Sequence, residues 1–169
     1  LLTNVKVETL GGKITMQQLW MPQHDPALLR VDNISSSELI SAVNPKQFAM
    51  SGPVSGALPF WLDNEKWIIK DGWLTNPGPM TLRIDKDTAD AIVKDNMVAG
   101  AAINWLRYME ISRSWTRINL DNLGELTMQA TIKGTSRVDG KSSSVNLNYT
   151  HDENVFTLWR SLRFGDNLQ

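Results

Sequence analysis

The sequence predicts a mainly β domain in which an antiparallel-rich sheet is accompanied by two or three inserted helices. Apolar and polar residues alternate in many short segments, which is the period-two pattern of strands with one buried face. The connections around residues 11, 64, 77 and 140 are too short for parallel crossovers, so we expect mainly antiparallel pairing. A chain of 169 residues can bury one proper core, which favours a single domain.

The first part of the chain predicts a hairpin, a strand and a short helix. Residues 5–18 alternate on both sides of the glycine pair at 11–12, as expected for a β-hairpin. Residues 27–34 (ALLRVDNI) follow two proline breakers and predict a short strand. Residues 35–43 (SSSELISAV) begin with serines, which cap helices well, and predict one short helix.

The segment QFAMSGPVSGALPFWL, residues 47–62, predicts an unusually long strand with bulky even-numbered and small odd-numbered residues. Residues 48–58 would extend about 36 Å at about 3.3 Å per residue, so their apolar face could form the floor of a groove. Ordinary sandwich core is the other interpretation, since alternation marks any half-buried strand. Two further strands are predicted at 67–74 and 80–85, separated by the turn residues NPGP.

The last part of the chain combines helical and strand patterns. Residues 88–109 have the spacing of an amphipathic helix, and a second apolar stripe predicts a helix at 153–163. Strands are predicted at 116–122, 125–134 and 144–150, with the polar residues between the last two forming a turn.

Composition and motifs argue against several classes of function. The formal charge of −1, with 17 basic and 18 acidic residues, predicts no binding to nucleic acid. Because there is no cysteine, thiol catalysis and thiolate metal sites are excluded. No run approaches the roughly 20 apolar residues needed to span a bilayer, so we expect any membrane anchor to lie outside this chain.

The histidines are the natural catalytic candidates, because His24 and His151 each precede an acid. Neighbouring side chains on a strand point in different directions, so these pairs are not by themselves sites. We expect His151 to end a strand, with Asp152 and Glu153 in the first turn of the helix that follows. No nucleophile motif, metal cluster or cofactor loop is found, so we predict a protein that is not an enzyme and uses no cofactor.

Three segments carry a resemblance to a known family. They are SGPVSGALPFWLDNEKWIIKDGWLTNPGP, LGELTMQATIKG and SVNLNYTHDENVFTLWRSLRFGD, at residues 51–79, 123–134 and 144–166. They resemble the carboxy-terminal region of the YdbH family, AsmA-like proteins of the Gram-negative envelope. The resemblance runs from about residue 45 to the end, and the earlier part fits by position.

This resemblance implies that residues 1–169 are a single carboxy-terminal domain, or fragment, of a larger periplasmic lipid-bridge protein anchored in the inner membrane. The family fold implies a sheet curled into an open trough, a half-barrel with an apolar interior, with the helices capping or backing it. Its relatives, TamB and YhdP among them, are thought to conduct phospholipids between the inner and outer membranes. The implied partners are phospholipid acyl chains and a small outer-membrane lipoprotein of the YnbE type, bound by β-strand pairing.

On this interpretation one set of apolar strand residues lines a groove for acyl chains. These lipid-groove candidates are Phe48, Met50, Val54, Leu58, Phe60, Leu62, Met80, Leu82, Ile84, Leu126, Met128 and Ile132. The alternative is a closed structural or interaction module that docks the lipoprotein by strand addition, with the lipid path ending before it.

Overall fold

The computed structural model describes residues 5–17, 19–43, 48–87, 90, 108–138 and 140–160, and most of them lie in strands. The elements are β1 (Val5–Thr9), β2 (Gly12–Met16), β3 (Ala27–Ser35), α1 (Ser36–Val43), β4 (Phe48–Ser51), β5 (Pro53–Phe60), β6 (Trp67–Thr75), β7 (Met80–Ile84), β8 (Tyr108–Asp121), β9 (Glu125–Val138) and β10 (Lys141–Asn154). Residues 155–160 form a further short helix. The mainly β fold with inserted helices is therefore confirmed.

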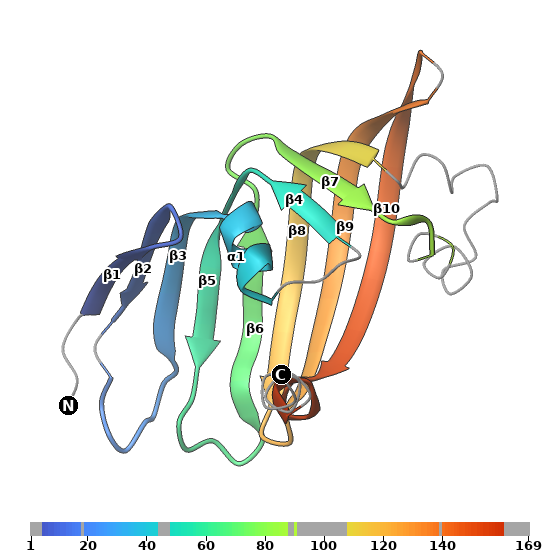
Figure 1. Ribbon diagram of the computed structural model, residues 1–169. Coiled ribbons are helices and arrows are strands. Elements are labelled where there is room, and N and C mark those ends of the chain that lie inside the picture. The colour runs from blue at the N-terminus through green and yellow to red at the C-terminus, as the bar shows by residue number, and fades with distance from the viewer. Residues whose placement is uncertain are drawn as a thin grey trace, which may run out of the picture.

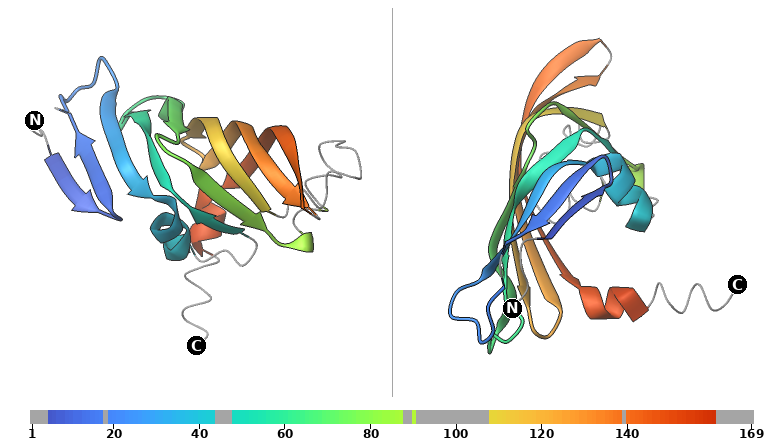
Figure 2. Two further views of the ribbon diagram at one scale, coloured as in Figure 1. Left: turned by 90° about the horizontal axis from the view of Figure 1, so that it is seen from above. Right: turned by 90° about the vertical axis from the view of Figure 1, so that its left-hand side faces the viewer.

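The strands form one ten-stranded sheet that curls without closing into a barrel (Figure 1). All of its strand pairs are antiparallel, as the short connections predict. Within the described residues, β1 pairs with β2 alone and β10 pairs with β9 alone, so each forms an edge. Figure 2 shows the sheet as a crescent, with α1 and the helix of residues 155–160 on its concave side.

The sheet divides at β8. One edge of β8 pairs with β9, whereas the other pairs first with β7, at residues 108–111, and then with β6, at residues 115–121. β4 pairs with β7 and extends this branch. The branch of β7 and β4 crosses in front of β8, β9 and β10 on the concave side, so the sheet folds over itself at this end (Figures 1 and 2).

The prediction of one long strand over residues 47–62 is wrong, because the chain bends sharply at Gly52. Gly52 has a φ of 108°, a conformation that only glycine adopts easily. β4 therefore joins the branch with β7, while β5 lies between β3 and β6 in the main sheet. The Ser36 hydroxyl donates a hydrogen bond to the Gly52 carbonyl oxygen at 2.8 Å, which links the start of α1 to the bend.

Further boundaries differ from the prediction. The strands predicted at 116–122, 125–134 and 144–150 are longer in the structure, as β8, β9 and β10. Tyr108 and Met109, assigned to the helix at 88–109, begin β8; most of that helix lies outside the described residues. Asp152 and Glu153, assigned to a helical turn, continue β10, because β10 stays paired with β9 as far as Asn154. The helix begins after Asn154, whose side-chain oxygen accepts a hydrogen bond from the Thr157 backbone N–H at 2.9 Å and caps it.

The buried core lies where the branch covers the main sheet. Met109, Ile111 and Leu147 pack there against apolar residues of β7, and Met109 has no exposed surface. Partly buried side chains surround this cluster: Met50, Val54, Ile132, Val145 and Tyr149. The helix α1 was expected to cap or back the sheet, and it lies against β3 and β4 beside this core.

Candidate functional site

The strand register shows that most residues on one face of the sheet are apolar. Directly opposed residues of antiparallel strands point to the same face. One chain of such partners, which we call the long row, crosses eight strands: Val7, Ile14, Val31, Gly56, Leu74, Thr116, Ala130 and Tyr149. A second, the lower row, lies near the lower strand ends in Figure 1: Ala27, Phe60, Ile69, Leu120, Leu126 and Glu153. We call the surface that carries both rows the apolar face.

The lipid-groove candidates fall into register with this face, with Leu62 as the exception. Leu58 pairs with Leu29, Met128 with Ile118, and Ile132 with Leu147. In the branch, Met50 pairs with Leu82 and Phe48 with Ile84. Leu62 lies beyond β5 in a loop and is 62% exposed. The alternation in sequence thus places these segments on one surface, although they are far apart along the chain.

The candidates on this face differ strongly in how far they are covered. Met80, Leu82 and Ile84 of β7 are buried in the core. We call this covered part, where β4 and β7 lie over β8 to β10, the closed half. Leu58, Phe60, Leu126 and Met128 are only partly buried and do not belong to the core cluster. At the β1 edge exposure is greater still, since Val7 is 48% exposed. Strands β1, β2, β3, β5 and β6 make up the open half, together with the ends of β8, β9 and β10 that carry the lower row.

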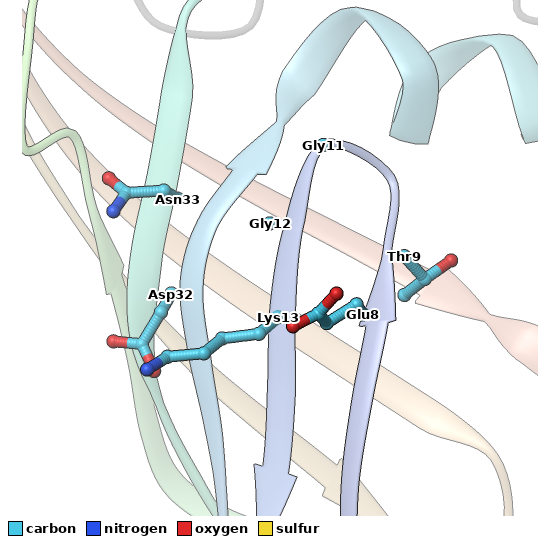
Figure 3. A pocket seen from close by; sticks show the side chains of 7 residues that line it. All are labelled: Glu8, Thr9, Gly11, Gly12, Lys13, Asp32 and Asn33. Atoms are coloured by element: carbon cyan, nitrogen blue, oxygen red, sulfur yellow. The ribbon is translucent and has the colours of Figure 1, made fainter.

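The opposite face of the sheet is polar. Its rows include Glu8, Lys13 and Asp32, which are cross-strand partners and line an open recess of about 570 Å³ near the β1–β2 turn (Figure 3). Trp73 and Trp115 stack on this face with ring centroids 4.8 Å apart. In the part of the chain that the structure describes, no group of three or more His, Cys, Asp or Glu could hold a metal ion.

The two histidines occupy different settings. His24 lies exposed in the loop before β3, beside a recess of about 220 Å³ that Trp20 and Pro22 also line. His151 lies on the apolar face, whereas Asp152, the acid next to it, pairs with Thr127 and points to the opposite face. Sequence reasoning missed the true neighbours of His151, Tyr149 and Glu153. The spacing Tyr-x-His-x-Glu was the available signal, because alternate residues of a strand share a face.

The fold and the face together define a class: an open, curled antiparallel sheet with a mostly apolar face that β4 and β7 cover in part. The chain belongs to the YdbH-like family, whose model, described as intermembrane phospholipid transport protein YdbH, matches residues 1–169. The family recognised in the three segments is thus confirmed, and the match includes the residues before 45.

One relative is close in sequence. The probable phospholipid transport protein YdbH of Escherichia coli (strain K12) is 80% identical over 169 residues, which is all of this chain but 19% of that protein's length. No solved structure matches the chain. Among the described residues, no helix is long and apolar enough to cross a membrane.

Proposed function

We propose that this chain is a periplasmic segment of a bridge-like lipid transfer protein, and that it conducts phospholipids between the inner and outer membranes along its apolar face. The observation that carries the proposal is the long row, which runs across the strands from β1 to β10. At about 4.8 Å per strand the row extends roughly 34 Å. Half of a bilayer's hydrocarbon core is about 15 Å thick, so an acyl chain fits along it.

We propose that the acyl chains lie along the lower row. Its members Phe60, Ile69, Leu120 and Leu126 are half-buried and stand outside the core cluster that the branch covers. Acyl chains would bind there by removal of apolar surface from water, which is nondirectional and allows sliding. The printed names of the family and of the Escherichia coli relative support a phospholipid as the cargo. No bond is made or broken in such transport, so the proposal needs neither catalysis nor a cofactor.

Photocrosslinking to lipid tests this proposal. A photoreactive amino acid would replace Leu126 on the lower row or, as the matched control, Thr127, its neighbour on the opposite face. In intact cells with radiolabelled phospholipid, we expect adducts at Leu126 and at least tenfold fewer at Thr127. Equal labelling at both positions, or no labelling at either, would show that the apolar face does not carry lipid.

We propose, as a second function, that the outer edge of β10 accepts a β-strand from a small outer-membrane lipoprotein of the YnbE type. β10 is 14 residues long and pairs with β9 alone among the described residues, and a long uncovered edge is a template for strand addition. Crosslinkers placed along β10 are expected to capture the lipoprotein, whereas those along β1, the edge strand at the far end of the main sheet, are not. Capture at β1 alone, or at neither edge, would overturn this assignment.

A further inference from the structure

Three side chains of β10 form a chain of polar contacts on the apolar face. The Tyr149 hydroxyl lies 3.0 Å from Nδ1 of His151, and Nε2 of His151 lies 3.3 Å from Oε2 of Glu153. In the tautomer that carries its proton on Nε2, the Tyr149 hydroxyl donates to the ring and the ring donates to the Glu153 carboxylate. We call these three residues the polar triad.

The setting of the polar triad is unusual, because each member ends a row of apolar or small residues. Tyr149 ends the long row, and Glu153 follows Leu126 at the end of the lower row. His151 ends a row that contains Gly72, Ile118 and Met128. A carboxylate beside an apolar surface is costly unless a partner compensates its charge. The His151 contact compensates it in part, while the side chains of His151 and Glu153 stay 38% and 36% exposed.

We propose that the polar triad is a headgroup site that holds a zwitterionic amine-bearing phosphate at the β10 end of the apolar face. This inference rests on the proposed function. A primary ammonium that takes the place of the His151 ring beside the Glu153 carboxylate donates hydrogen bonds to that carboxylate. The Nε2–H of His151 is then available to a phosphate oxygen, while the Tyr149 hydroxyl keeps donating to Nδ1 and fixes the tautomer. The triad thus presents an acceptor for the cation and a neighbouring donor for the anion of a phosphoethanolamine headgroup.

The position of the polar triad is compatible with a lipid whose headgroup binds the triad and whose acyl chains lie along the rows of the apolar face. Leu126 and Met128 are the direct cross-strand partners of Glu153 and His151, so a headgroup on the triad places acyl chains on β9, β8 and β6. Tyr149 also packs against the core cluster of the closed half. It therefore holds the polar triad in place on one side while Glu153 borders the lower row on the other.

Headgroup preference tests the inference with a matched pair of variants. Glu153→Gln removes the charge on the apolar face, and Asp152→Asn removes the same charge one residue away on the opposite face. Binding of dihexanoyl phosphatidylethanolamine and phosphatidylcholine to the purified protein would be measured by native mass spectrometry. Choline has no N–H donor, so we expect about fivefold preference for ethanolamine in the parent and in Asp152→Asn, and equal binding in Glu153→Gln. If the ratio of ethanolamine-lipid to choline-lipid binding is the same in all three proteins, the headgroup site is contradicted.

A second measurement separates this inference from the proposed function. The ring resonances of His151 would be followed by NMR during titration with glycerophosphoethanolamine, which has no acyl chains, and with inorganic phosphate. A shift that is larger with glycerophosphoethanolamine and is lost in Glu153→Gln supports the headgroup site. If the protein shows this shift but retains no lipid, the headgroup site stands and only the proposal of lipid conduction is contradicted. An equal response to inorganic phosphate, or none to either compound, would overturn the inference.

Discussion

The closed and open halves of the sheet carry the same alternating pattern but use it differently. In the closed half, Leu82 and Met109 are cross-strand partners, and both are buried under the domain's own residues. In the open half, Val7 and Ile14 are also partners, yet Val7 is 48% exposed and Ile14 only partly buried. The difference teaches that alternation determines which residues share a face, while the presence of a second layer determines whether that face becomes core or accessible surface.

The division at β8 produces this difference. β8 and β9 are each 14 residues long, so a strand of five residues, β7, and β6 fit one after the other along one edge of β8. The bend at Gly52 sends β4 with β7, away from the main sheet. One half of the apolar face is therefore covered by the branch, and the other half is not covered by it.

The largest expected contrast is between two methionines on the apolar face. Met109→Ala empties a fully buried position, and we expect the free energy of unfolding to fall by about 2–5 kcal/mol. Met16→Ala, the same change on β2 in the open half, should cost about 1 kcal/mol or less, because the side chain is only partly buried. Urea denaturation of both variants measures the contrast. Equal losses would mean that the two halves are equally covered.

A smaller effect on the free energy of unfolding is expected at the Gly52 bend, which separates β4 from β5. A Cβ on Gly52 would lie 2.6 Å from the Pro79 carbonyl oxygen, at a φ of 108°. Gly52→Ala should therefore lower the free energy of unfolding by about 1–3 kcal/mol. Gly140→Ala is the control, because Gly140 also has positive φ but no atom within 4 Å of the added carbon. A loss no greater than that of the control would show that the bend tolerates a side chain.

The smallest effect on stability is expected at the edge of the open half. Val7→Asn places a polar group on the exposed end of the long row and should change the free energy of unfolding by about 0.5 kcal/mol or less. Lys6→Asn, on the opposite face of β1, is its control. Denaturation of the protein without lipid gives both values. A loss above about 1 kcal/mol at Val7 alone would indicate that this part of the face is already covered.

Most strands could be predicted because alternation is a local property. The hairpin of β1 and β2, the strands β3, β6 and β7, and helix α1 follow from patterns within about ten residues. The break at Gly52 was missed because its neighbours alternate without interruption, and the bend depends on pairing with β7. The end of β10 was missed for a similar reason: Asp152 and Glu153 suit a helix start, but the ladder with β9 holds them in a strand.

The sequence by itself determined the class of fold, the family, and which residues of a single strand share a face. It could do so because side-chain direction alternates along any strand, whatever the strand pairs with. Only the tertiary structure decided that Leu82 is core whereas Leu126 stays accessible, and that Tyr149, His151 and Glu153 stand at the ends of apolar rows. Burial and the composition of each row depend on pairing between distant segments, which no local pattern specifies.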